Sequence, residues 1–310
     1  MIYKVSHVST YDYTDNVSLS HHLLRLKPRG LPHQRCLANT VEIDPQPAIS
    51  EQHIDYFGNC VTFVTIEGAH RTLTIRSTSQ VSVMHPNVPA PAETPAWETV
   101  REFNRGHQIG PALEASEFIF DSPLIKSRDD FAAYAASSFA KERPILEAVL
   151  DLTRRIYTDF KFDPKATTVA TPLEEVFKHR RGVCQDFAQF EIACLRSLGL
   201  PARYVSGYIE TTPPPGKEKL AGADASHAWV SFYCHGIGWI DMDPTNNVIP
   251  TTRHITVAFG RDYNDVSPVR GVILGAGEHS LEVAVDVIAV KEPVAAAVSD
   301  EHALPTNRRA

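Results

Sequence analysis

The first 85 residues alternate between apolar and polar side chains with a period of two. The alternation is clearest at residues 40–43, 61–63, 73–75 and 81–83, with prolines between some of these segments. A period of two predicts strands with one buried face, and this part of the chain has no run with the period of a helix. We therefore expect residues 1–88 to form a small antiparallel β-domain.

A proline-rich segment follows the predicted β-domain. Its density of prolines disfavours both helices and central strands. Four of them fall within ten residues: Pro86, Pro89, Pro91 and Pro95. Residues 89–110 are therefore expected to connect two domains, and 310 residues suffice for two domains that each bury a core.

After the connector the apolar residues follow the period of a helix. They recur at spacings of four, three and four from Ile145 to Ile156. A second helix is predicted from Thr171, a good N-cap, with Glu174 three residues later completing a capping box. We expect this helix to stop near Gly182, where a glycine can take the left-handed conformation of a helix end.

A third helix is expected to start near Cys184 and to end at Gly199. Period-two segments follow at residues 203–208, 227–233 and 238–243. Helices followed by strands predict a second domain of the α+β class, in which helices pack on an antiparallel sheet. A further alternating segment runs from residue 281 to 290, so this domain is assigned residues 111–292, with a flexible tail at 293–310.

Composition and charge narrow the class of protein. Apolar residues make up 43% and charged residues 22% of the chain, as in ordinary globular proteins. The net charge of −7 disfavours a nucleic-acid partner held by a basic surface. No stretch approaches the roughly 20 apolar residues of a membrane span, and no signal peptide is recognisable at the N-terminus, so we expect a cytoplasmic protein with no membrane partner.

Five cysteines are scattered along the chain without a CxxC pair, which disfavours a disulfide framework and a zinc ribbon. Cys184 stands out because it begins a predicted helix, where unpaired N–H groups and the helix dipole favour a thiolate. Gly182 just before it allows a tight turn that leaves the sulfur accessible. The alternative is that Cys184 is a small buried apolar residue, as cysteines commonly are.

His227 is the first residue of the predicted strand at 227–233, and Trp229 lies on the same face of this strand. A three-residue loop at 234–236 would form a hairpin, and His227 would then lie opposite Asp243. Opposed residues on one face have Cβ atoms about 4.5–5.5 Å apart, within reach of a hydrogen bond. A different loop length would favour Asp241, so that residue is the competing carboxylate.

A thiol, an imidazole and a carboxylate together suggest nucleophilic catalysis. In such a set Cys184 attacks a carbonyl, His227 holds and moves the proton, and Asp243 fixes the tautomer of the imidazole. The alternative for His227 alone is a polar strand residue that faces solvent.

The motifs around these residues resemble those of the bacterial transglutaminase-like proteins. They are the segments at 181–188, 200–208, 224–229, 238–247 and 260–271. The N-terminal half is similar to the β-region that precedes this domain in many bacterial members, through His7, Thr10-Tyr11 and the segments at 25–29 and 55–59. The resemblance implies a papain-like α+β core, often described as that of a cysteine protease, with Cys184, His227 and Asp243 as catalytic residues. Phe162 is a departure, because relatives often carry tyrosine there.

Other residues are candidates for shaping the site. The backbone N–H of Cys184 is the natural first donor to an oxyanion, and Gln185 is available as a second one. Asp224 and Trp229 flank His227, although a plain loop role for the first and a core or pocket-wall role for the second are equally consistent with the sequence. The loop at 211–219 could cover the cleft or be a solvated connector.

The remaining thiols and histidines receive no role in catalysis. Cys36, Cys60, Cys194 and Cys234 are interpreted as packing residues or surface thiols, and the predicted turn at Cys234 would allow that thiol to be exposed. The His21-His22 pair has no further ligands around it, so neither a metal nor another cofactor is expected.

These features favour a cysteine-dependent acyl-transfer enzyme that acts on a peptide or protein substrate. Hydrolysis, as in a protease or amidase, needs no second specific substrate site and is preferred. The alternatives are a transglutaminase or peptide ligase with an amine acceptor, and a peptide-binding module without turnover. The oligomeric state does not follow from the sequence.

Overall fold

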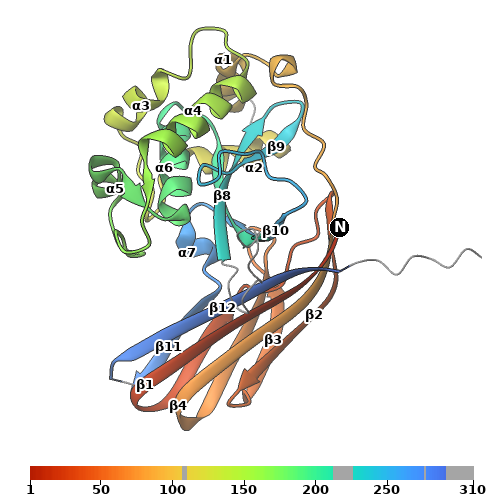
Figure 1. Cartoon of the computed structure of the whole chain (residues 1–310), viewed down its shortest axis with the longest axis vertical. Helices are drawn as coiled ribbons and strands as arrows, with labels where there is room; N and C mark the ends of the chain where they lie inside the picture. The colour runs from red at the N-terminus through yellow and green to blue at the C-terminus, as the bar shows by residue number, and fades with distance from the viewer. Residues whose placement is uncertain (107–109, 212–225, 276, 291–310) are drawn as a thin grey trace, which may run out of the picture.

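The computed structural model describes residues 1–106, 110–211, 226–275 and 277–290, and it has the expected α+β architecture. A large antiparallel sheet lies at one end of the molecule, helices lie at the other, and a smaller sheet lies between them (Figure 1). The predicted tail at 293–310 lies outside the described residues.

The large sheet has six strands in the order β11-β1-β4-β2, with β12 also pairing with β1 and β3 with β4. Buried and exposed side chains alternate along much of β1 and β4, as the period of two predicts. The strands are β1 (Ile2–Leu24), β2 (Gln34–Asp44), β3 (Ile49–Ile54), β4 (Cys60–Val83), β11 (Val269–Gly275) and β12 (His279–Val290).

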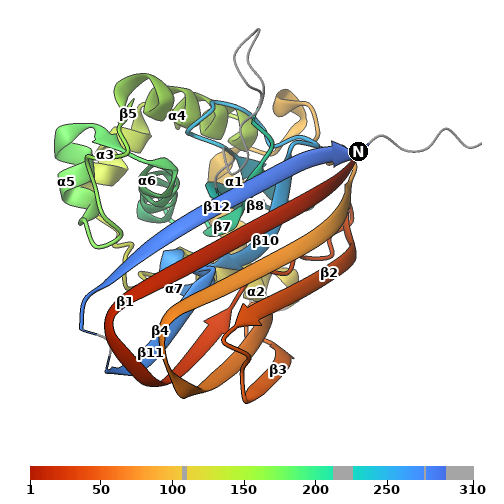
Figure 2. The ribbon, with the colours of Figure 1, turned by 60° about the horizontal axis from the view of Figure 1, so that its bottom comes forward.

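Two of these strands come from the end of the chain, which corrects the expected domain boundaries. The strands β11 and β12 were assigned to the catalytic domain of residues 111–292, but both pair antiparallel with β1 in the N-terminal sheet. Figure 2 shows β12 lying alongside β1, on the side opposite β4. The reason is that β1 would otherwise leave a long row of backbone N–H and C=O groups unpaired along one edge. The β-domain is therefore completed only when the chain returns to it.

The predicted connector also differs from the structure. Its proline-rich part ends at Pro95, and α1 follows within the 89–110 segment, with Val100 buried in the main core. The helices are α1 (Trp97–Gly106), α2 (Pro111–Ser116), α3 (Asp129–Ala136), α4 (Ile145–Asp159), α5 (Leu173–His179), α6 (Cys184–Ser197) and α7 (Tyr263–Val266), with short 3₁₀ turns η1 (Pro91–Glu93) and η2 (Glu117–Ile119).

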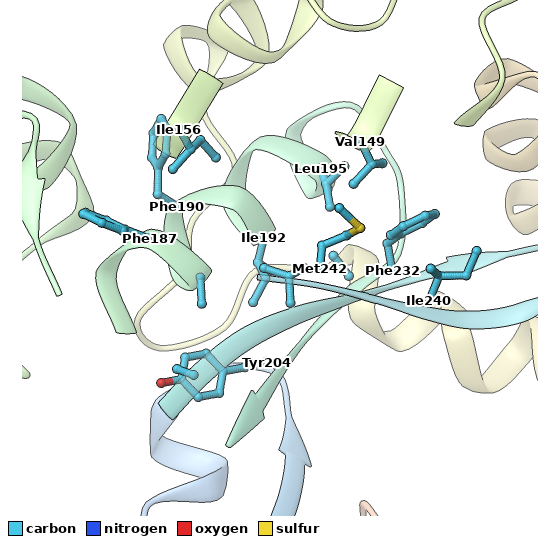
Figure 3. Close-up of a cluster of buried hydrophobic side chains, with 14 of the residues drawn as sticks. Val149, Ile156, Phe187, Phe190, Ile192, Leu195, Tyr204, Phe232, Ile240 and Met242 are labelled. Atoms are coloured by element: carbon cyan, nitrogen blue, oxygen red, sulfur yellow. The ribbon is translucent and has the colours of Figure 1, made fainter. Parts of the chain in front are cut away.

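The smaller sheet has four antiparallel strands in the order β10-β7-β8-β9, and α6 packs on one of its faces. Side chains of α4, α6, β8 and β9 meet in this core, as Figure 3 shows for Val149, Leu195, Phe232 and Met242. The strands are β7 (Ala202–Ile209), β8 (Ser226–Cys234), β9 (Gly238–Met242) and β10 (His254–Gly260), and a parallel pair of two-residue strands, β5 (Lys161–Phe162) and β6 (Arg181–Gly182), precedes α6.

The ends of α5 differ from the capping expected from the sequence. Pro172 rather than Thr171 is the N-cap, and no side chain caps the helix there. At the other end Arg180, not Gly182, takes the left-handed conformation, with φ of 53°. The Arg180 guanidinium stacks on the rings of Tyr134, Phe160 and Phe177, and these contacts offset the strain of a non-glycine residue in this region.

Two side-chain amides of the β-domain join the two sheets. Gln34 Nε2 donates to Thr256 O and Gln34 Oε1 accepts from Thr256 N–H, both at 2.8 Å. Asn59 makes the same pair of bonds to Phe259, also at 2.8 Å. Both amides are almost fully buried. They replace the backbone of a neighbouring strand along the outer edge of β10, and so fix this strand against the β-domain.

Candidate active site

Cys184 is the first residue of α6 and is partly exposed. The first backbone hydrogen bond of the helix runs from Phe187 N–H to Val183 O at 3.1 Å. The N–H groups of Cys184 and Gln185 precede it and have no partner within the helix. The expected position of the thiol, at a helix N-terminus that favours an anion, is therefore present.

A buried carboxylate fixes the turn that leads to Cys184. Asp186 Oδ2 accepts from Val183 N–H at 2.8 Å and from Thr167 Oγ1 at 2.6 Å. Burial raises the pKa of Asp186, and these two hydrogen bonds act in the opposite direction. A Cβ atom on Gly182 would lie only 2.5 Å from Asp186 Oδ2. Gly182 is therefore needed for the close approach of this carboxylate, not for the end of α5.

His227 lies in β8, is 7% exposed, and places its Nε2 2.7 Å from Asp243 Oδ2. Burial by itself lowers the pKa of His227, but the hydrogen bond to Asp243 and the adjacent Cys184 thiol outweigh it and raise the pKa to about 10. The imidazole is therefore protonated at neutral pH. Because Nε2 is used by Asp243, Nδ1 is the ring nitrogen left to face the sulfur.

The hairpin that brings His227 and Asp243 together has a different register from the expected one. The loop is residues 235–237, Cys234 pairs with Gly238, and Tyr233 pairs with Trp239 rather than Ile237. Gly238 adopts φ of 105°, which only glycine tolerates readily, and this moves the loop one residue along the chain.

Asp243 still meets His227 despite this shift. The strand β9 ends at Met242, and Asp243 begins a turn that closes on Val248 through an isolated bridge. The carboxylate is thus free of the strand ladder and reaches the imidazole from the turn. The pairing of the two side chains was predicted correctly, but the register used to predict it was wrong.

Asp243 is completely buried and accepts hydrogen bonds at both oxygens. Oδ1 accepts from the backbone N–H groups of Thr245 at 2.9 Å and Asn246 at 3.2 Å, and Oδ2 accepts from Asn246 Nδ2 at 2.7 Å. Burial opposes ionisation, but the hydrogen bonds to His227 and His254 hold the pKa of Asp243 well below its usual range. The carboxylate is therefore ionised and fixed in orientation.

His254, at the start of β10, is a second imidazole on Asp243, and sequence reasoning missed it. Its Nε2 lies 3.0 Å from Asp243 Oδ2, and its Nδ1 accepts a long bond of 3.4 Å from Thr251 N–H. Nδ1 is thus an acceptor, so Nε2 carries the proton that it donates to the carboxylate. The strands β10 and β8 are not neighbours, so no pairing rule could have linked His254 to Asp243.

The competing carboxylate, Asp241, has a different partner. Asp241 Oδ2 accepts from Trp229 Nε1 at 3.0 Å. Trp229 is fully buried, and its ring lies 6.0 Å from that of His227 and 5.3 Å from that of His254 between centroids. Trp229 therefore packs behind both imidazoles and is part of the wall rather than a reacting group.

Gln185, the expected second donor, follows Cys184 at the start of α6 and is half-buried. Asp224 and the residues from 212 onward of the 211–219 loop lie outside the described residues. Phe162, where relatives often carry tyrosine, is 52% exposed beside α6.

The remaining thiols have environments unlike that of Cys184. Cys36 and Cys60 are partly exposed, whereas Cys194 and Cys234 are buried. Of the two interpretations of Cys234, the packing residue is the one observed, because Cys234 ends β8 instead of lying in the predicted turn. Burial raises the pKa of Cys194 well above its usual value and that of Cys234 to about 11. These two thiols are therefore poor nucleophiles at neutral pH.

The donor atoms of His227, Asp243 and His254 lie within 4.8 Å of one another, a set that can hold a metal ion. All three donors are, however, engaged in the hydrogen bonds around Asp243 described above. That no metal takes part therefore stays a prediction. Among the described residues, no helix is both long and apolar enough to cross a membrane.

Comparisons with known proteins identify relatives of both halves of the chain. Residues 3–82 match the family described as the bacterial transglutaminase-like N-terminal region, and residues 132–244 match the transglutaminase-like superfamily. An uncharacterized protein of Mycobacterium tuberculosis is 42% identical over 294 residues, with 92% of each chain covered. A protein-glutamine gamma-glutamyltransferase of Pseudomonas aeruginosa is 33% identical over 99 residues, which is 29% of this chain and 15% of the relative.

The fold has a counterpart among solved structures. A proposed cysteine protease from Cytophaga hutchinsonii superimposes with a TM-score of 0.69 at 21% sequence identity. The match covers 94% of this chain and 92% of the other. Both halves of the molecule are therefore shared with that structure.

Proposed function

The chain belongs to the transglutaminase-like superfamily and carries its bacterial N-terminal region, and on this premise we propose that Cys184, His227 and Asp243 catalyse acyl transfer through a thioester. One observation carries the proposal. The His227 imidazole lies between a partly exposed thiol at a helix N-terminus and a buried, ionised carboxylate. Each group has the position that nucleophilic catalysis by a thiol requires.

Acylation begins at the sulfur of Cys184. The positive charge of His227 and the N-terminus of α6 both stabilise negative charge on this sulfur. The sulfur attacks the carbonyl carbon of an amide, a C–S bond forms, and the oxyanion accepts from the backbone N–H of Cys184. The proton of His227 passes to the leaving amine as the C–N bond breaks. Asp243 keeps the imidazole oriented throughout.

Deacylation returns the enzyme to its starting state. His227, now neutral, takes a proton from water as the water oxygen attacks the thioester carbon. The C–S bond breaks, the acid is released, and the sulfur regains its negative charge beside the imidazolium. Hydrolysis is preferred because it needs no specific site for a second substrate, so we propose a protease or amidase that acts on peptide or carboxamide substrates.

Transamidation is the second candidate, and the similarity to the gamma-glutamyltransferase supports it. An amine would then replace water in the second step, and the product would be a new amide. The two reactions share every residue up to the thioester, so the chemistry of the acceptor alone distinguishes them.

One experiment tests the nucleophile before any substrate is known. Iodoacetamide labelling followed by peptide mass spectrometry should show Cys184 reacting faster than Cys60, a thiol that is also partly exposed. His227→Ala should lower the rate at Cys184 and leave the rate at Cys60 unchanged. Equal rates at both cysteines in the parent, together with no effect of His227→Ala, would contradict an activated thiol and leave a peptide-binding module.

A second experiment identifies the reaction. A library of peptides and carboxamides is assayed for ammonia and amine release, with and without added primary amines, using Cys184→Ala as the inactive control. New acids and an unchanged rate with amines support hydrolysis. Incorporation of the added amine supports transamidation, and release that persists in Cys184→Ala contradicts both.

A further inference from the structure

A cavity of about 760 Å³ lies between the β-domain with its connector and the smaller sheet. Its sheet side is the face opposite the α6 core, because Trp229 points into it while its neighbours Ala228 and Val230 pack in that core. All four strands of the smaller sheet contribute to the wall. Cys184 does not line the cavity, whereas His254, the second imidazole on Asp243, does. The cavity is therefore separate from the reacting sulfur.

Arg203 of β7 lines this cavity between two aromatic rings. Its guanidinium carbon lies 4.0 Å from the centroid of Trp239 and 3.6 Å from that of Phe259. Its Nε is buried with no hydrogen-bond partner, and among the described residues no ion pair or hydrogen bond satisfies the guanidinium. Burial lowers the pKa of Arg203 to about 9, with Asp241 acting against this change, so the group is still charged at neutral pH.

Arg203 is partly exposed, but its Nε is shielded from water, and a guanidinium has five donors and no acceptor. Stacking on aromatic faces holds it in place without using its N–H groups. The donors are thus left for a planar acceptor, and a carboxylate can accept two of them at once.

An opposite charge faces the same cavity two strands away. Arg203 pairs in register with Ser231 of β8, and Ser231 pairs with Asp241 of β9. The three side chains therefore follow one line across one face of the sheet, with about 10 Å between the two outer Cα atoms. Ser231 Oγ, in the middle, is buried and has no hydrogen-bond partner. Asp241 uses Oδ2 for Trp229, and its distance from Arg203 exceeds that of an ion pair.

We propose that this cavity binds a small zwitterion of the amino-acid class, with its carboxylate on Arg203 and its ammonium group on Asp241. Ser231 lies between these two residues in the register of the strands, but it is fully buried and does not line the cavity. The body of the ligand would lie against the apolar part of the wall, which includes Leu31, Ile237 and Ile249. The volume falls in the range of small-molecule sites, roughly 300–1,000 Å³.

Other ligand classes fit this wall less well. A simple anion would satisfy Arg203 but would lie close to two carboxylates, Asp241 and Glu114. A simple cation would satisfy the carboxylates but would face Arg203. Only a molecule with both charges leaves neither side of the cavity unpaired.

The test measures binding by isothermal titration calorimetry on the full chain carrying Cys184→Ala, so that no ligand is turned over. Four probes share one aromatic ring: phenylalanine, 3-phenylpropionate, phenethylamine and the amide of N-acetylphenylalanine. Phenylalanine should bind tightest and the uncharged amide at least about tenfold more weakly. A neutral amide that binds as well as phenylalanine, or no binding of phenylalanine at millimolar concentrations, would overturn the proposal.

Two variants assign the two charges. Arg203→Met should weaken phenylalanine and 3-phenylpropionate by about tenfold or more and leave phenethylamine unchanged. Asp241→Asn should weaken phenylalanine and phenethylamine and leave 3-phenylpropionate unchanged. Arg76→Met, which removes an exposed arginine of β4, is the control and should change none of the affinities.

The crossed pattern cannot arise from a general loss of structure. If Arg203→Met fails to fold, the Asp241→Asn variant and the four probes on the parent still decide the matter. Equal losses for all four probes in a folded variant would contradict the assignment. The proposal does not depend on the reaction at Cys184, because binding is measured without the nucleophile.

Discussion

The smaller sheet and the turn after it hold two charged side chains with opposite environments, a fully buried Asp243 and a partly exposed Arg203. Asp243 accepts five hydrogen bonds, two from backbone N–H groups, one from Asn246 and two from imidazoles. Within the described part of the chain Arg203 has none, and aromatic rings hold it. A charge with every partner supplied by the protein is fixed in position and cannot accept anything more. A charge without partners keeps its hydrogen bonds available for another molecule.

The difference matches the two proposed roles, catalysis for Asp243 and ligand recognition for Arg203. Saturation of Asp243 stabilises the ionised carboxylate and the orientation of His227, which a proton-transferring imidazole needs. The Arg203 guanidinium lowers stability through its Nε, which is buried without a hydrogen bond to replace the lost water. The following changes test this contrast, starting with the largest expected effect.

Asp243→Asn should disrupt the hydrogen-bond network around this carboxylate. The amide presents the wrong group to His227 Nε2, so turnover is expected to fall by up to about 10⁴-fold, as in the serine triad. The variant should also lose about 1.5–3 kcal/mol of unfolding free energy with its charge-assisted hydrogen bonds. Kinetics on the substrate found by the library and urea denaturation measure the two effects. Full activity in a folded variant would contradict the role of this carboxylate, and Asp15→Asn, an exposed position, is the matched control.

His254→Ala should weaken the same hydrogen-bond network and leave the Asp243 carboxylate in place. Asp243 loses one of its donors, and we expect turnover to fall about tenfold, as for other residues that orient a reacting group. His254→Gln retains an N–H donor and should recover part of the loss. The pH–rate profile distinguishes a positioning role from a general loss of structure. A change in the environment of Asp243 shifts the pH values at which the rate rises and falls. A drop by the same factor at every pH would mean that His254 is only structural.

The protonation of His227 should contribute to the pH dependence of the free energy of unfolding. Its pKa rises from about 6.5 in the unfolded chain to about 10 in the folded one, so folding favours its protonated form. This contribution is complete below about pH 6.5 and is lost as the pH rises through about 10. The free energy of unfolding should therefore fall over this range, and more steeply in the parent than in His227→Gln. Parallel curves for the two proteins would contradict the raised pKa.

Arg203→Met should have the smallest effect on stability. The variant loses the contacts with Trp239 and Phe259 but also removes a charged group whose Nε is buried without a hydrogen bond, so the two changes nearly cancel. We expect the free energy of unfolding to change by less than about 1 kcal/mol. A loss comparable to that of Asp243→Asn in urea denaturation would show that the two charges are not treated differently.

Local patterns were enough to predict much of the fold and part of the site. The period of two predicted both β regions, and the helix starting at Cys184 followed from its apolar stripe and from the Gly199 stop, where φ is 79°. The sequence also predicts the contact between His227 and Asp243, but through a shifted register, because Asp243 reaches the imidazole from the turn after β9. Side chains that meet across one tight turn are within the range of such rules.

The features that the sequence did not reveal depend on segments that are distant in the chain. The pairing of β11 and β12 with β1, more than 240 residues away, has no local signal. His254 reaches Asp243 from a strand that does not neighbour β8. The aromatic rings around Arg203 come from β9 and β10, and they become neighbours only when the sheet is complete.

The side-chain amides of Gln34 and Asn59 have a consequence for recombination between genes of this family. The two family regions, at residues 3–82 and 132–244, look like modules that evolution could exchange separately. Yet a catalytic half without the first module would leave the outer edge of β10 bare, and bare edges recruit strands from other molecules. It would also release β11 and β12 without a sheet to join. Recombination between the halves is thus penalised by aggregation, and the two are expected to pass between genomes as one unit.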